Sequence, residues 1–207
     1  FCVADLSSQR QVRRLAEDIR ACVEAGGAGK IDVLVNNAGA VASWYTATED
    51  GFELQVAVNH LAPFLLTYEL MPLLSRAAGG RVVTVASRAH RRMRINWRDV
   101  MLRRTYHGFL AYKQSKLANV LFTAEFNRRV SPATGVRAFA ADPGLVNTQI
   151  ASKSSQGLIR WIWERRSARG ASPEEGAVTV IHLAADPSVN GTSEFYWRKC
   201  QPLPPSR

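Results

Sequence analysis

Apolar positions along the chain follow two patterns. In the first, short continuous apolar runs end in polar or turn-forming residues, which is typical of strands buried on both faces of a sheet. These runs are FCVADL (1–6), IDVLVNNAG (31–39), RVVTVAS (81–87), VRAFAADPG (136–144) and SEFYW (193–197). Each run is interpreted as one strand, and FCVADL is expected to be a buried strand that ends at Asp5.

Between the runs, apolar residues recur at the spacing of amphipathic helices. In the first such stretch, Val12, Leu15 and Ile19 form one apolar stripe behind a capping Ser7 or Ser8. Further helices are expected at about 50–76, 109–130 and 173–185, with a short one within 152–169. Strands that alternate with helices predict an α/β fold with a doubly wound, Rossmann-like parallel sheet. No repeat or linker interrupts the pattern, so a single domain is expected over residues 1–207.

Cysteine content bears on the compartment and on metal binding. The 207-residue chain has three cysteines, none in CxxC or Cys/His ligand spacing. We therefore expect no disulfide framework and no metal site, and a reducing, cytoplasmic compartment fits best. No run of about 18 apolar residues occurs, so the pattern predicts no membrane-spanning helix.

The net charge of +10 raises the question of a polyanionic partner. Arginines gather in RAHRRMRINWRD (88–99), but no groove-entering helix or stacking platform accompanies them. We therefore expect a solvated rim beside a site and no nucleic-acid partner. The segment GLIRWIWERR (157–166) leaves three interpretations open: a lid over an apolar substrate, peripheral contact with an anionic membrane surface, or core packing of a short helix.

Tyr112 and Lys116 are four residues apart in a predicted helix, so they share one face. A phenol with an ordinary pKa of about 10 is a poor acid or base at neutral pH. A neighbouring ammonium group stabilises the phenolate and is expected to lower that pKa. The pair could then exchange a proton with a carbonyl or alcohol oxygen, although the same spacing also occurs by chance in many helices.

Polar, turn-forming residues follow three of the predicted strands. Ser87 ends one strand, Asn36-Asn37-Ala38-Gly39 ends another, and Asp142-Pro143-Gly144 ends a third. The carboxyl ends of parallel strands lie at one edge of a sheet, where ligands of doubly wound folds bind. We therefore expect these turns to converge with Tyr112 and Lys116 on one site.

This combination resembles the short-chain dehydrogenase/reductase superfamily. The resemblance rests on NNAG (36–39), Asn59, Ser87, the Tyr112–Lys116 pair and Pro143-Gly144. Within the superfamily, AYKQSKLANVLF (111–122) and HLAPFLLT (60–67) are similar to the retinol dehydrogenase-like branch. The resemblance implies an NAD(P)-dependent oxidoreductase that interconverts a carbonyl and an alcohol on a small-molecule substrate, and an apolar substrate fits.

The resemblance also implies a role for each matching residue. Tyr112 would donate or accept the proton, Lys116 would lower the pKa of that tyrosine and hold the nicotinamide ribose, and Ser87 would orient the substrate oxygen. Asn59 would anchor a water molecule in a proton relay towards Lys116. The other implied cofactor contacts are Asp5 and Leu6 beside the adenine, Asn36, Ala38 and Gly39, and Pro143, Gly144, Val146 and Thr148 around the nicotinamide. NADP is favoured over NAD as the cofactor.

The chain departs from the family in one respect. Family members begin with a strand, a TGxxxGxG turn and a helix that receives the cofactor pyrophosphate, and this turn does not occur here. We therefore expect a fragment without the family's first two strands, in which FCVADL has no neighbouring strand and one side of IDVLV is exposed. The alternative is a catalytically silent binding protein or subunit with the same fold, or an inactive fragment. The oligomeric state stays open.

Overall fold

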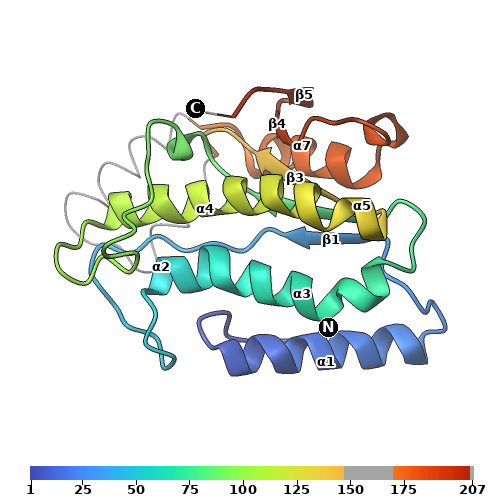
Figure 1. Ribbon diagram of the computed structural model, residues 1–207, viewed down its shortest axis with the longest axis horizontal. Helices are drawn as coiled ribbons and strands as arrows, with labels where there is room; N and C mark the ends of the chain where they lie inside the picture. The colour runs from blue at the N-terminus through green and yellow to red at the C-terminus, as the bar shows by residue number, and fades with distance from the viewer. Residues whose placement is uncertain (147–169, 206–207) are drawn as a thin grey trace.

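A five-stranded sheet forms the centre of the computed structural model, which describes residues 1–146 and 170–205 (Figure 1). Its strands, in both chain and spatial order, are β1 (Val33–Asn36), β2 (Arg81–Val85), β3 (Arg137–Asp142), β4 (Tyr196–Arg198) and β5 (Gln201–Pro202). The pairs β1–β2, β2–β3 and β3–β4 are parallel, and β5 runs antiparallel to β4. This arrangement confirms the predicted Rossmann-like α/β fold.

The longer helices occupy the intervals that the sequence pattern predicts. The helices are α1 (Gln9–Ala25), α2 (Leu54–Val56), the π-helix η1 (Ala57–Leu61), α3 (Ala62–Leu74), the 3-10 helix η2 (Arg88–His90), α4 (Gly108–Arg129), α5 (Ser131–Thr134), α7 (Pro173–Ala185) and the 3-10 helix η4 (Pro187–Val189). The short helices η2, α5 and η4 were not predicted. Ser8 caps α1, and Ser172 caps α7 through a capping box with Glu175. The helix predicted within 152–169 lies outside the described residues. No helix in the described part of the chain is long and apolar enough to cross a membrane.

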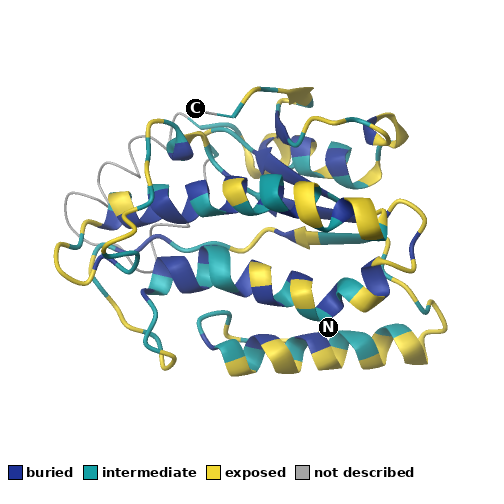
Figure 2. Cartoon of the chain, viewed as in Figure 1, coloured by how far each residue is buried: buried dark blue, intermediate teal, exposed yellow. Residues whose placement is uncertain are grey.

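Two apolar layers sandwich the sheet because successive strand residues point to opposite faces. On one face, Val82 and Ala138 pack against a cluster from α1, α3 and α4 that includes Leu70 and Phe126. On the other face, Val83 and Phe139 pack against α7, chiefly Leu183. Both layers are buried in the middle of the sheet (Figure 2).

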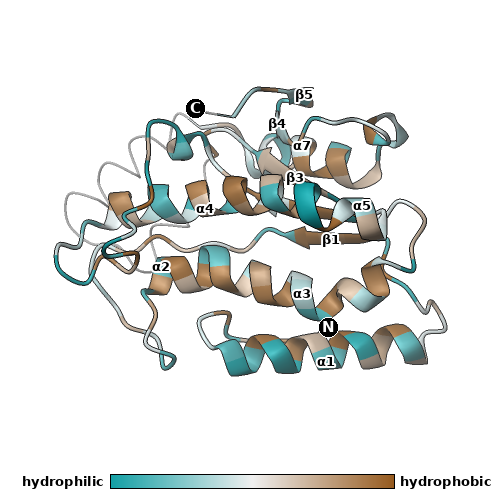
Figure 3. Cartoon of the chain, viewed as in Figure 1, coloured by the Kyte–Doolittle hydropathy of each residue, from teal (hydrophilic) through white to brown (hydrophobic). Residues whose placement is uncertain are grey.

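The first predicted strand is wrong. Residues 1–5 belong to no strand, and the Phe1 and Val3 side chains are exposed. A strand needs a neighbour for its backbone N–H and C=O groups, and no described strand lies next to this segment. The expected exposure of one side of IDVLV is confirmed, because β1 is an edge strand and Val35 is 39% exposed. Most of β1 is apolar, so this edge exposes hydrophobic surface (Figure 3).

The long helix predicted at 50–76 is interrupted by a π-helical turn. The segment consists of α2, η1 and α3, and η1 (Ala57–Leu61) contains Asn59. A π-turn inserts one extra residue into the helical repeat and is often found at functional sites. Hydropathy spacing does not reveal such a turn, since its flanking residues keep the apolar pattern.

The β4–β5 hairpin was not predicted. Its two central residues, Lys199 and Cys200, have φ values of 51° and 56°. Positive φ at both central residues is the geometry of a type I′ turn, which usually contains Asn or Gly. Lys-Cys carries neither signal, so the turn is not visible in the sequence.

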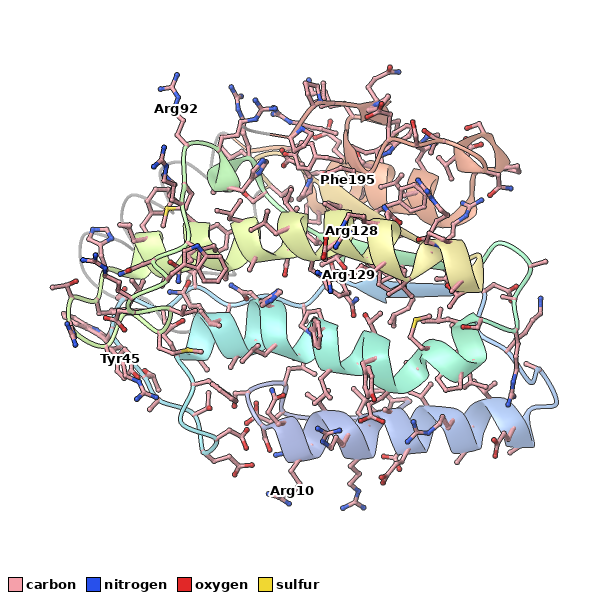
Figure 4. All side chains as sticks on the ribbon, viewed as in Figure 1. Arg10, Tyr45, Arg92, Arg128, Arg129 and Phe195 are labelled. Atoms are coloured by element: carbon pink, nitrogen blue, oxygen red, sulfur yellow. The ribbon has the colours of Figure 1, made fainter. Side chains whose placement is uncertain are left out.

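Several arginines have structural partners. Arg81 donates from Nη1 to the Leu183 and Asp186 carbonyls, at 2.9 and 3.0 Å, and so satisfies acceptors at the C-terminal end of α7. Arg103 donates to the Gly51 carbonyl at 2.8 Å. In contrast, Arg92 after η2 projects away from the body of the molecule, and Arg10 on α1 also points outward, with its Nη2 3.6 Å from Glu49 Oε1 (Figure 4). Part of the positive charge therefore stabilises loops, and part is solvated.

At Gly108, the first residue of α4, the chain passes very close to Ala42. A Cβ atom on Gly108 would lie 2.1 Å from the Ala42 carbonyl oxygen. That oxygen also accepts hydrogen bonds from Gln55 Nε2 and Tyr106 Oη, both at 3.3 Å, so it is held in place. Glycine at this position lets the first turn of α4 pack against the loop that follows β1.

We predict that Gly108→Ala lowers the free energy of unfolding by about 1–3 kcal/mol, the usual cost of overpacking. Helix propensity alone predicts the opposite sign, because alanine favours helix over glycine by about 1 kcal/mol. Gly26→Ala at the end of α1 is the control, since its new Cβ would meet nothing closer than the Cys22 carbonyl at 3.2 Å. Urea unfolding of both variants checks this, and equal midpoints would contradict the packing argument.

Candidate active site

Tyr112 and Lys116 lie on the buried face of α4, across the carboxyl end of β2. Their relative exposures are 7% and 2%. Lys116 Nζ donates a hydrogen bond to the carbonyl of Val85, the last residue of β2, at 2.8 Å. The helix therefore fixes the spacing of the pair, and the end of the strand fixes its position.

Ser87 joins this pair two residues beyond the end of β2. Its backbone is extended and caps η2, where its Oγ accepts from the Ala89 N–H at 3.2 Å. The same hydroxyl forms a side-chain hydrogen bond with the Tyr112 phenol. The structure thus brings together the three side chains that the sequence analysis expects at one site.

The pKa of Tyr112 differs from the expectation. Burial raises the pKa of the phenol to about 12, the Ser87 hydrogen bond opposes the rise, and the negative charge of Asp142 adds to it. The expected net lowering is therefore wrong in this structure. Burial also lowers the pKa of Lys116 to about 8, and its Nζ, 5.8 Å from the centre of the Tyr112 ring, donates to Val85 instead of to the phenol.

Asn59 connects η1 to the turn that follows β1. Its Oδ1 accepts from the Ala40 N–H at 2.6 Å, and its Nδ2 donates to the Ala40 carbonyl at 3.0 Å and to Ser115 Oγ at 3.0 Å. The side chain therefore holds the backbone just beyond NNAG against α4. Its predicted role in a water relay stays a prediction.

Asn119 is a site residue that the sequence reasoning missed. Its Nδ2 donates to the Asn59 carbonyl at 2.8 Å, and its Oδ1 lies 3.1 Å from His60 Nδ1. Asn119 is buried and stands three residues after Lys116, on the same face of α4. The sequence signal that could have identified Asn119 is a polar residue three positions after Lys116 on a helix face that is buried.

Residues predicted to line the cofactor fall into two groups. Ala38 is exposed, and Gly39, Pro143, Gly144 and Val146 are half-buried at the carboxyl edge of the sheet. In contrast, Asn36 Nδ2 points into the protein, 3.2 Å from Thr67 Oγ1 and 3.4 Å from Thr84 Oγ1. Thr148 lies outside the described residues.

Asp5 and Leu6 lie in the turn before α1. The Asp5 carboxylate accepts from the Ser7 N–H at 2.9 Å, and this bond lowers the pKa of the carboxyl. Leu6 packs with Val12 and Leu65 in the contact between α1 and α3. No hydrogen bond among the described residues connects either residue to the Tyr112–Lys116 pair, so their adenine contact stays a prediction.

The arrangement fits the nicotinamide–ribose end of a dinucleotide. Lys116 Nζ has three N–H donors, and Val85 is its one hydrogen-bond acceptor among the described residues. Ribose hydroxyls could take the remaining donors. The neighbouring Ala38 and Gly39 present little side-chain bulk. Residues 1–146 and 170–205 contain no glycine-rich strand–turn–helix unit for the pyrophosphate.

A separate apolar groove of about 330 Å³ lies between η1–α3 and α4. His60, Phe64, Trp97 and Phe122 are among the residues that line it. Tyr112, Lys116 and Ser87 do not line it, so this groove is distinct from the cluster that these three residues form.

Comparison with known proteins gives the same family as the geometry. The family model described as short chain dehydrogenase matches residues 1–158. Retinol dehydrogenase 14 of Mus musculus is 37% identical over 205 residues, covering 95% of this chain and 58% of that protein. Retinol dehydrogenase 12 of Homo sapiens is 38% identical over 197 residues, covering 95% of this chain and 60% of that protein. The chain thus spans less than two thirds of the length of these curated relatives.

Solved structures agree. An uncharacterised protein from Mycobacterium paratuberculosis superposes with a TM-score of 0.68 at 34% identity, covering 99% of this chain and 66% of that one. Pseudomonas aeruginosa RhlG, described as an NADP active-site complex, superposes with a TM-score of 0.66 at 25% identity, covering 95% of this chain and 73% of that one. With its parallel sheet, its buried tyrosine–lysine pair and these matches, the chain belongs to the short-chain dehydrogenase family and is similar within it to the retinol dehydrogenases.

Proposed function

We propose that this chain carries the catalytic groups of an NAD(P)-dependent oxidoreductase that interconverts a carbonyl and an alcohol. The observation that carries the proposal is the cluster of the half-buried Ser87 with the buried Tyr112 and Lys116 at the carboxyl edge of the sheet. A serine hydroxyl, a phenol and an ammonium group in contact with one strand end can bind and protonate a single oxygen atom.

Each side chain has a separate task in this proposal. The bound nicotinamide supplies or takes the hydride. Ser87 donates a hydrogen bond to the substrate oxygen and holds it beside the Tyr112 phenol, which gives its proton to that oxygen. Since burial keeps Tyr112 in the neutral form, the charge state in this structure is the one required for carbonyl reduction. Lys116 binds ribose hydroxyls and provides positive charge next to the phenolate that remains.

The substrate and cofactor classes draw on the relatives. Two of the similar proteins are retinol dehydrogenases, and a third, 36% identical over 222 residues, is polyprenol dehydrogenase of Mus musculus. Retinol and polyprenol are both apolar alcohols, which supports an apolar alcohol or aldehyde as the substrate here. The RhlG complex with NADP supports NADP as the preferred cofactor over NAD.

Replacing Tyr112 tests the proposal. In the native full-length protein, we expect Tyr112→Phe to lower turnover of an apolar aldehyde with NADPH at least about 100-fold, because the proton donor is lost. The affinity for NADPH, measured from the change in NADPH fluorescence on binding, should not change, because the aromatic ring and Lys116 remain. Tyr68→Phe is the control, since Tyr68 is 68% exposed on α3. Retained turnover in Tyr112→Phe would exclude the assignment.

The same experiment distinguishes the rival interpretation. A catalytically silent binding protein would have no turnover in the wild type with either NADPH or NADH.

Lys116 should make stability depend on pH. Burial lowers the pKa of its ammonium group from 10.5 to about 8 in the folded chain. Between these values the unfolded chain binds more protons than the folded chain, so the free energy of unfolding rises with pH, by up to about 3 kcal/mol. We expect Lys116→Met to abolish this rise between pH 8 and 10.

Chemical denaturation across that pH range measures the effect. Lys113→Met is the matched control, because the half-buried Lys113 lies one position along the helix from Tyr112 with its Nζ 5.9 Å from the Phe109 ring centre. Equal slopes of stability against pH in the wild type and Lys116→Met would contradict a buried ammonium group at this position.

A further inference from the structure

The carbonyl oxygen of Ser87 accepts two hydrogen bonds from His90. The backbone N–H of His90 lies 3.1 Å from it, and the ring Nδ1 lies 2.7 Å from it. A carbonyl oxygen only accepts hydrogen bonds, so Nδ1 must carry the ring hydrogen. Burial lowers the pKa of the His90 imidazole and so favours the neutral ring, while the Ser87 carbonyl selects the tautomer.

Residues of the neighbouring strands hold the His90 ring in place. His90 is fully buried, and the Tyr196 ring of β4 meets it edge to face, with ring centres 4.9 Å apart and planes at 67°. Tyr196 Oη donates to Asp142 Oδ2 at 2.7 Å, and Asp142 Oδ1 accepts from the Gly144 N–H at 2.9 Å. The ends of β2, β3 and β4 are thereby connected through one chain of buried contacts.

These contacts fix both sides of Ser87. His90 holds the backbone carbonyl, and the Ala89 N–H occupies one lone pair of the Ser87 hydroxyl oxygen at 3.2 Å. The hydroxyl proton then points away from η2, and the hydroxyl is bonded to the Tyr112 phenol. A ring that no longer held the carbonyl would let the Ser87 peptide plane rotate and would move the hydroxyl.

We propose that His90 is a positioning residue for Ser87, which holds the Ser87 peptide plane so that its hydroxyl meets the substrate oxygen beside Tyr112. This inference rests on the proposed oxidoreductase function and deepens it. In this proposal His90 acts on the substrate oxygen through Ser87. Tyr196 and Asp142 support the ring from behind.

A double-mutant cycle tests this dependence in the native full-length protein. The variants are His90→Leu, Ser87→Ala and the double variant, each assayed with an apolar aldehyde and NADPH. We expect His90→Leu to lower kcat roughly 10- to 100-fold, the scale for misplacing a group that orients the substrate. The KM for NADPH should not change, and His90→Leu should cause no further loss in the Ser87→Ala background.

His90→Asn is the conservative variant, because the asparagine amide can place an N–H where Nδ1–H lies. We expect it to recover most of the kcat that His90→Leu loses. Thermal unfolding of each variant shows whether the protein still folds. Tyr196→Phe keeps the ring but removes the hydrogen bond to Asp142, so it should lower kcat less than His90→Leu does.

Several results would overturn the proposal. Losses that multiply in the double variant, or an Asn variant as poor as the Leu variant at equal stability, would show that His90 does not act through Ser87. NMR of protein with ¹⁵N-labelled histidine identifies the tautomer of His90 independently of turnover, and the His90→Asn variant assigns the signal. An Nε2–H tautomer of His90 would also refute the proposal. An inactive wild type would instead refute the proposed function itself, and the role of His90 with it.

Discussion

The need to satisfy polar groups buried under α4 determines the geometry of the site. Tyr112, Ser115, Lys116 and Asn119 all face inwards from this helix, where water does not replace a missing partner. Each therefore bonds to a backbone or side-chain group of β2, η1, α4 itself or, for Tyr112, to Ser87 at the start of η2. Moving the helix by one residue would leave several of these groups unpaired. The hydrogen bonds that stabilise the helix on the sheet thus also set the distances between the groups proposed to react.

Burial has a second consequence, since a medium of low polarity disfavours charge. It raises the pKa of the Tyr112 phenol and lowers the pKa values of the His90 imidazole and the Lys116 ammonium group, so the neutral form of each group is favoured. Asp142 is the buried carboxylate in this region, and it is stabilised by the Tyr196 hydroxyl, the Gly144 N–H and the nearby Arg198 guanidinium group. Substrate and cofactor would enter an environment that already has few mobile charges, where a small displacement of one donor has a large electrostatic effect.

Most of the fold was predictable, because continuous apolar runs and helical stripes are properties of the local sequence. The strand at 81–85 and the helix that carries Tyr112 and Lys116 follow directly from such patterns. FCVADL shows the limit: its composition favours a strand, but a strand exists only beside another strand. The raised pKa of Tyr112 was equally invisible, since it depends on how deeply α4 is buried. His90 and Asn119 gave no motif of their own, because their importance lies in which backbone carbonyls they meet.

The π-turn in η1 also bears on how this protein could be engineered. Deleting one residue from Ala57–Leu61 would convert the segment to regular α-helix, which a design procedure based on ideal helix geometry would favour. The flanking turns would keep their orientation, because the π-turn already absorbs one extra residue, but the residues within the turn would change position. Asn59 would lose its paired bonds to Ala40, and the loop after β1 would come away from α4. A regular α-helix here would therefore disrupt the contacts that hold the site together. The π-turn should be kept when the protein is engineered for stability.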